Sequence, residues 1–338
     1  MALTEPTTGS TSPTDRRSVD DEVVVDAAEV ASREKFDALV RRLSAQSVAK
    51  HYDAYADIPW DDPAYAVDPD DPRWELPEVD SFGASEWYRA QPAGVRSRIG
   101  LYRFASAAKI GLQFENILKR GLLEYAFTLP NDDPRFRYVY HEVIEEAHHG
   151  LMFQELVNRS GMDIKGLPWH MKLGSQVVVA LGRIFPELFF VFVLGGEDPI
   201  DHVQRETLRS DRELPPIIEI IMRHHVTEEA RHLSFARHHL KQEVPRLPWW
   251  RKQVLAIGAP IILGIMASLM LAPPGAMKRE FGVGGDVLDE AYRGDTAGRQ
   301  KVKDSVRKVR QLCRELGLIN PVSRRLWIRF GIYSRDAA

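Results

Sequence analysis

Two short groups of histidine and glutamate residues have the types and the spacing of metal ligands. In the segment YHEVIEEAHH (140–149), Glu146 precedes His149 by three residues. Residues three apart lie about one turn apart on the same face of a helix, so one helix can offer both side chains to one site. Farther along, His225, Glu229 and His232 are spaced i, i+4 and i+7 and form a single stripe on a helix. A lone pair of this kind is usually a solvated surface pair, but two groups on separate helices predict a metal centre between them.

Two further carboxylates complete the pattern of a di-iron bundle. Ferritin-like di-iron proteins take a Glu-x-x-His from each of two helices and one glutamate from each of the other two. Glu115 follows the segment 110–114 (IGLQF) and interrupts a face that we expect to look inward, although a position at the boundary of the core is the alternative. Glu197 follows the apolar run 188–196. Because Pro199 comes two residues later, a glutamate at a helix end is the alternative interpretation there.

Charge and ligand type indicate which metal such a site would hold. Four carboxylates cancel the charge of two divalent cations, so the neutral cluster can lie in a core of low dielectric constant. Imidazole and carboxylate ligands suit iron or manganese, and a chain whose single cysteine is Cys313 cannot build a thiolate cluster. We therefore predict two iron ions, with manganese as the alternative, and molecular oxygen as the co-substrate that binds at open coordination positions.

The register of each ligand pair has neighbouring alternatives. Glu145 with His148 could replace the first pair, and Glu228 with His224 or His232 could replace the second. We prefer the first assignment because a helix can aim only one of two adjacent residues at the core. The remaining polar residues are then expected in a second layer or at the surface, where their carboxylates can orient the ligating imidazoles. They are Glu142, Glu145, His148 and His224.

Helical periodicity accounts for the elements that must position these residues. Apolar residues recur at spacings of three and four residues over most of the chain. The apolar–polar alternation that is typical of β-strands is scarce. The predicted helices cover residues 23–48, 94–127, about 134–160, 173–196, 215–240 and 298–317, with Gly317 as a stop signal. This pattern predicts an all-α, ferritin-like four-helix bundle core with additional N- and C-terminal helices. We expect a disordered tail at 1–22, one domain at 23–338, and a connector at 57–77 that wraps the surface.

Composition excludes several classes of partner and compartment. The 338 residues carry 45 basic and 48 acidic side chains, a formal net charge of -3, so we expect no nucleic acid as a partner. A single cysteine rules out a disulfide within the chain and fits a reducing compartment. The first 21 residues lack a basic stretch that leads into an apolar run. A cytoplasmic protein is therefore expected.

On the residues quoted above, the sequence resembles the p-aminobenzoate N-oxygenase (AurF) family of ferritin-like di-iron enzymes. The distinguishing mark is a third histidine four residues before the second Glu-x-x-His, the position that His225 has relative to Glu229 and His232. The resemblance extends from about Gly94 to the segment 309–318 (VRQLCRELGL). Carried over residue by residue, it implies the metal ligands Glu115, Glu146, His149, Glu197, His225, Glu229 and His232.

The resemblance also implies an activity, the oxidation of an amine to a hydroxylamine or nitro compound on a small or hydrophobic substrate. An electron donor, a ferredoxin or a reductase, would be needed, and a homodimer is expected. No arginine lies within a turn of Glu115, so we do not expect an acid such as p-aminobenzoate as the substrate. The apolar segment 177–194 is the predicted wall of a hydrophobic pocket.

Three other interpretations compete with this activity. The same scaffold could carry a hydroxylase or an acyl desaturase, it could bind iron without catalysis, or the chain could be a metal-free helical protein associated with membranes. The segment 254–272 has no charged residue, and a helix of that length would span about 28 Å. Gly258, Pro260 and Gly264 weaken a free helix. We expect a helix that covers the bundle, with peripheral membrane contact through 249–279 rather than a span.

Overall fold

The computed structural model describes residues 27–271, 275–291 and 296–334, and the predicted disordered tail at 1–22 lies outside them. Within these ranges the chain forms helices and no strand, which confirms the predicted all-α class. The long helices are α1 (Ala27–Ala49), α3 (Ala93–Ala126), α4 (Pro134–Arg159), α5 (Trp169–Ile184), α6 (Pro186–Arg209), α7 (Pro216–Glu243) and α8 (Trp249–Leu271). The shorter ones are α2 (Glu86–Arg89), α9 (Met277–Phe281), α10 (Gly285–Asp289), α11 (Thr296–Ser305), α12 (Arg307–Glu315) and α13 (Pro321–Arg329).

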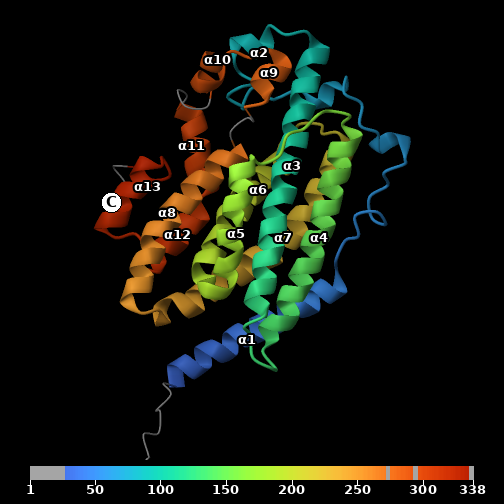
Figure 1. Ribbon diagram of the computed structural model, residues 1–338. Helices are drawn as coiled ribbons and strands as arrows, with labels where there is room; N and C mark the ends of the chain where they lie inside the picture. Colours follow the sequence, from blue (N-terminus) through green and yellow to red (C-terminus); the bar gives the residue numbers. More distant parts are fainter. Residues whose placement is uncertain (1–26, 272–274, 292–295, 335–338) are drawn as a thin grey trace, which may run out of the picture.

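Helices α3, α4, α6 and α7 form a four-helix core. Helix α3 packs along α4 and α6 packs along α7, while contacts of α3 with α6 and of α4 with α7 close the bundle. Helix α5 packs against α3 and α6, and α1 crosses α4 and α7 at one end (Figure 1). Helix α8 covers the outer side of α6, and α11 to α13 add a further layer there. The architecture is the predicted ferritin-like bundle with additional helices at both ends.

The third predicted helix, 173–196, is wrong, because a proline divides it. Helix α5 ends at Ile184 and α6 begins at Pro186, while Phe185 between them has φ -149° and ψ 70°. A residue before proline is pushed out of the helical region, and proline itself is favoured in the first turn of the next helix. Helix α6 then continues through Pro199 to Arg209. Glu197 therefore lies inside a helix, and the alternative of a helix-end glutamate is wrong.

The core of the bundle consists of two apolar clusters with a polar layer between them. In α3, residues 99–108 belong to one cluster and residues 114–126 to the other. In α7 the same division falls between Met222 and Leu233, and in α4 between Val139 and Met152. The polar residues proposed from the sequence occupy these gaps in α4 and α7, and Glu115 of α3 lies at the start of the second apolar stretch, next to Phe114. Burial of the two apolar clusters thus holds the helices in register around a polar centre.

The connector at 57–77 runs over the surface as predicted, and it also contributes residues to the core. Trp60 and Trp74 are buried, and the short helix η2 (Pro72–Trp74) packs on α3. A Cβ atom at Gly100 of α3 would lie 1.8 Å from the carbonyl oxygen of Trp74, so only glycine permits this approach. The connector thereby closes the end of the bundle where α3 begins.

The C-terminal part keeps the predicted stop signal but contains an extra break. The predicted helix at 298–317 is two helices, α11 and α12, separated at Val306. Gly317 has φ 70° and follows the last turn of α12, as its sequence predicts. In α8, the stretch Trp249–Leu269 is the one helical segment among the described residues that is long and apolar enough to cross a membrane. Leu255, Ala259 and Leu263 of that helix are fully buried in the protein.

Candidate metal centre

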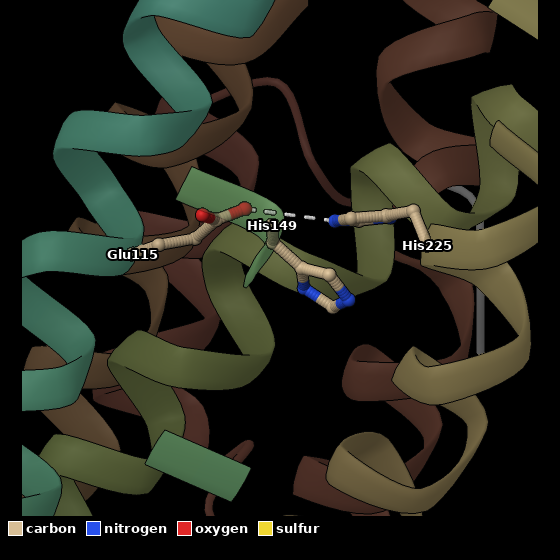
Figure 2. Close-up of side chains that lie close together, drawn as sticks. All are labelled: Glu115, His149 and His225. Carbon is tan, nitrogen blue, oxygen red and sulfur yellow. Dashed lines mark ion pairs between the residues drawn. The ribbon is translucent and has the colours of Figure 1, made fainter. Parts of the chain in front are cut away.

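Seven side chains that the sequence singles out as ligands converge between the four core helices. Glu115 comes from α3, the pair Glu146 and His149 from α4, Glu197 from α6, and the remaining three from α7. None is more than 3% exposed. Figure 2 shows three of them, Glu115, His149 and His225, which project from α3, α4 and α7 toward one another. The seven are Glu115, Glu146, His149, Glu197, His225, Glu229 and His232.

The seven residues form three groups whose ligand atoms lie within 4.8 Å of one another, and these groups overlap. Glu229 and His225 each belong to two groups, so the cluster is continuous. The groups are Glu115, His149 and His225; Glu146, Glu229 and His232; and Glu197, His225 and Glu229. Overlapping groups of this kind have room for more than one ion, with a carboxylate shared between neighbours.

One nitrogen of each histidine faces the carboxylates. Nδ1 of His232 lies 3.0 Å from Oε1 of Glu229 and 3.1 Å from Oε1 of Glu146. Nδ1 of His149 lies 3.6 Å from oxygens of the same two glutamates. Nε2 of His225 lies 3.7 Å from Oε1 of Glu115 and 3.9 Å from Oε1 of Glu229. Most of these distances exceed a hydrogen bond, which is the spacing expected when a cation fills the space between donor atoms.

The other nitrogen of each histidine is held by a polar side chain outside the cluster. Nε2 of His149 lies 2.8 Å from Oε2 of Glu228, and Nε2 of His232 lies 2.7 Å from Oε2 of Glu145. Nδ1 of His225 lies 2.8 Å from the amide oxygen of Gln204. Because each of these partners is an acceptor, the outer nitrogen of every ring must donate and the inner nitrogen keeps a lone pair for a metal.

The outer carboxylates are themselves fixed. Arg231 lies 2.9 Å from Glu145 and 3.6 Å from Glu228, and all three side chains are buried. Oε1 of Glu228 also accepts a hydrogen bond of 2.9 Å from the backbone N–H of Tyr52, in the segment after α1. One guanidinium thus compensates two carboxylates and ties α4 to α7 behind the histidines.

Burial and mutual repulsion perturb the carboxylates of the cluster. Burial, together with the charge of Glu146, raises the pKa of Glu115 to about 8. Burial and the charge of Glu229 raise the pKa of Glu197 well above its usual value. Burial opposes ionisation of Glu146 as well, but the charges of the neighbouring His149 and His232 hold its pKa well below the usual range. A cluster of this kind needs added positive charge to ionise fully at neutral pH.

Several buried oxygens of the cluster lack hydrogen-bond partners among the described residues. They include Oε2 of Glu115, both oxygens of Glu146, Oε1 of Glu197 and Oε2 of Glu229. A buried carboxylate oxygen without a partner is costly, and a cation removes that cost. The donor set of carboxylates and imidazoles, with no thiolate, fits two ions of iron or manganese.

The structure also decides which of the remaining polar residues lie in a second layer and which lie near the surface. It adds two functional residues that the sequence analysis missed. Glu142 and Glu145 are buried beside the cluster, whereas His148 and His224 are partly exposed, His224 stacking on Tyr52. Burial raises the pKa of Glu142 to about 8. The two missed residues are Gln204 and Arg231. Gln204 follows Glu197 by seven residues, two helical turns on one face, and this spacing was the available signal.

A cavity of about 540 Å³ adjoins the cluster at Glu115, Glu197 and His225. Its described walls come from α3, α4, α6 from Gly196 onward, α7, α8, α11 and the connector. The prediction that residues 177–194 line the pocket is therefore wrong. Phe189 to Leu194 are buried in the apolar core instead, where Phe190 and Phe192 pack against aromatic rings of α3 and α7.

Comparison with known proteins agrees with this geometry. The family model for "P-aminobenzoate N-oxygenase AurF" matches residues 33–317. The chain belongs to the AurF family. The match begins well before Gly94, so the extent predicted from the motifs was too short at the N-terminal side. Because the family domain supports a di-iron oxygenase, the buried cluster and the membership point to the same chemistry.

Similar chains of this family occur in mycobacteria. Uncharacterized proteins from two strains of Mycobacterium tuberculosis and from Mycobacterium bovis are each 40% identical to this chain over 299 residues, which is 88% of each chain. No solved structure matches the chain.

Proposed function

We propose that this protein is a di-iron oxygenase that oxidises an amine nitrogen, and that the seven converging side chains are its metal ligands. The observation that supports the proposal most directly is the buried cluster itself: carboxylates of Glu115, Glu146 and Glu229 face three imidazole nitrogens at 3.0–3.9 Å. Several other oxygens of the cluster have no hydrogen-bond partner among the described residues. Such a set is stable only with cations between its members. The AurF family membership supports the same chemistry.

When bound, the two iron ions supply the reaction with oxygen, using electrons from a ferredoxin or a reductase. The protein's own groups hold and shield them. Glu145, Glu228 and Gln204 orient the three histidines, and Arg231 balances the charge of the first two. The apolar walls around the cluster exclude water from the reacting atoms. Substrate would reach the centre through the cavity beside Glu115, Glu197 and His225.

A hydroxylase or an acyl desaturase is the second candidate, and the shape of the cavity favours it. The cavity is lined largely by apolar and aromatic side chains, and it extends along α3 away from the cluster. A C–H bond of an apolar chain could occupy the position beside the ligands as well as an amine could. A non-catalytic iron-binding role has no comparable support, because storage needs a hydrophilic cavity.

Metal content and product identity test the proposal. Protein purified from iron-replete cells should contain two transition-metal ions per chain. After reduction and exposure to oxygen, it should convert an apolar arylamine to a hydroxylamine or nitro product. An unsaturated or hydroxylated product from an acyl chain would select the second candidate. Wild-type protein without bound transition metal would exclude both.

A further inference from the structure

The cavity beside the cluster is long, as the lining residues of two helices show. Arg103 and Glu115 both line it from α3 and are twelve residues apart, which corresponds to about 18 Å along a helix. Glu197 and Glu206 line it from α6 and are nine residues apart, about 14 Å. The cavity thus extends from the candidate ligands toward the beginning of α3, where the connector and α2, α9 and α10 lie (Figure 1).

The middle of the cavity is apolar, and small residues of α3 leave the space open. Ala107, Ala108 and Gly111 lie between Arg103 and Glu115 on the cavity side of α3. Ile221 and Met222 of α7 line the same part of the cavity. This stretch offers no charged partner, so it suits a hydrocarbon chain or a series of linked rings.

The outer end is positively charged. Nη1 of Arg103 lies 2.9 Å from Asp80, which follows the connector, and both side chains are partly exposed. Lys301 of α11 lines the cavity too, and its charge acts on Asp80. Burial opposes ionisation of Asp80, yet the charges of Arg103 and Lys301 hold its pKa below the usual value. The carboxylates of Asp80 and Glu206 thus stand against the cations of Arg103, Lys301 and Arg212, so the charged residues at this end leave one net positive charge.

We propose that the substrate is an elongated amphipathic molecule whose carboxylate head binds at Lys301 and Arg103 and whose apolar body places its far end beside Glu115, Glu197 and His225. The inference rests on the proposed function for the reaction at that far end. A single aromatic ring is much too short to touch Arg103 and the candidate ligands at once. The absence of an arginine close to Glu115 is thereby explained, because the acidic group is recognised about three helical turns away, near 18 Å along α3.

Binding of simple probes to the full-length, metal-containing protein tests this inference. The probes are palmitate, hexanoate, hexadecanol and p-aminobenzoate, each titrated by calorimetry. Palmitate should bind at least about a hundredfold more tightly than hexanoate, because ten more methylene groups are buried. It should also bind roughly fivefold more tightly than hexadecanol, which lacks the charged head.

Two variants locate the probe. Lys301→Gln should reduce palmitate affinity roughly fivefold and leave hexadecanol unchanged, whereas Lys303→Gln, on the same helix but outside the cavity lining, should change neither. Gly111→Leu should reduce palmitate affinity at least about tenfold by filling the middle of the cavity. A Cβ atom at Gly111 meets only the ring of Phe153, at 3.4 Å, so α3 can accept it. Gly174→Leu, where a Cβ meets nothing within 4 Å, is the matched control.

Equal affinities for palmitate and hexanoate would overturn the inference, as would palmitate binding that ignores both Gly111→Leu and Lys301→Gln. Metal analysis of the same samples separates this failure from that of the proposed function. If the protein contains two metal ions but does not prefer the long acid, the proposed substrate class is wrong and the proposed oxygenase function stands. If the protein binds palmitate in the predicted way but contains no metal, the proposed binding site stands and the proposed oxygenase function is wrong.

Discussion

The candidate centre has two sides that differ in charge and in access. The enclosed side consists of His149 and His232 with their partners Glu228 and Glu145, all closed off by Arg231. The cavity side consists of His225 with the neutral amide of Gln204, together with Glu115 and Glu197. Every member of the cavity side lines the cavity, and no member of the enclosed side does.

This difference predicts unequal roles for the two sides of the proposed metal centre. A carboxylate that accepts from an imidazole raises the basicity of the ring and strengthens its bond to a metal, whereas a neutral amide does so less. The histidines of the enclosed side are therefore predicted to bind metal more strongly. The cavity side keeps a histidine that is oriented but less strongly polarised, next to the space from which substrate arrives. The predictions below test this contrast, starting with the residue that both sides share.

Glu229→Ala should have the largest effect, because Glu229 contacts His149, His225 and His232 and thus belongs to both sides. The variant should lose at least one of the two metal ions per chain, and His232→Ala should do the same. Elemental analysis of the purified proteins gives the count. Glu219→Ala is the control, since Glu219 lies on the same helix but is paired with Arg223 near the surface. Unchanged metal content in both cluster variants would remove the basis of the metal assignment.

Glu228→Ala should weaken metal binding on the enclosed side by about 10- to 100-fold, because His149 loses the acceptor that fixes its ring. The variant also leaves the backbone N–H of Tyr52 without its carboxylate. Competition with a chelator of known affinity measures the change. Glu228→Gln keeps an acceptor oxygen and should recover part of the loss. A full-affinity Glu228→Ala protein would show that the enclosed side is not held by its carboxylates.

The ligands could be predicted from the sequence because helix geometry alone decides which residues share a face. His225, Glu229 and His232 at i, i+4 and i+7 must form a stripe wherever the helix lies, and Glu146 with His149 follows the same rule. The four-helix core followed from the long periodic stretches that carry them. The break between α5 and α6 was also readable, because Pro186 lies within the predicted helix and restricts the residue before it.

The cavity could not be predicted in the same way. Its position depends on how the volumes of side chains from several helices fit together, and no single helix pattern contains that information. The apolar run at 177–194 has the composition of a pocket wall, yet it packs into the core. Gln204 was missed for a related reason. Its spacing from Glu197 places it on the same face of the helix, but only the folded structure shows that this face brings it next to His225.

Metal removal should make stability depend on pH. In the metal-free protein, burial and Glu146 raise the pKa of Glu115 to about 8, and burial raises that of Glu142 to about 8, from the ordinary 4.5. The folded state then binds more protons than the unfolded state between these values, so the free energy of unfolding falls as pH rises. Burial lowers the pKa of His232, but the charges of Glu229 and Glu142 outweigh burial and raise it well above 6.5. This contribution also disappears as pH rises.

The loss of stability in the metal-free protein should be clearest between pH 6.5 and about 8. Burial lowers the pKa of His225, so this residue makes the free energy of unfolding rise with pH. That rise is complete by pH 6.5 and does not disturb the window. Chelator-treated protein should therefore melt a few degrees lower at the upper end of this window, whereas the metal-loaded protein should show little change, because the cations replace the protons. Thermal melts of both forms across the window measure this. A metal-free protein that gains stability toward pH 8 would contradict it.

Gln204→Leu should have the smallest effect on metal binding and the most local one. Leucine keeps most of the volume but cannot accept from Nδ1 of His225, so this ring loses one neutral hydrogen bond, worth about 1 kcal/mol. Metal affinity should fall by less than about tenfold. Gln204→Glu should instead strengthen binding by giving His225 the same kind of partner that His149 has. If Gln204→Leu were as damaging as Glu228→Ala, the two sides would be equivalent, and access to the cavity would be the one difference left between them.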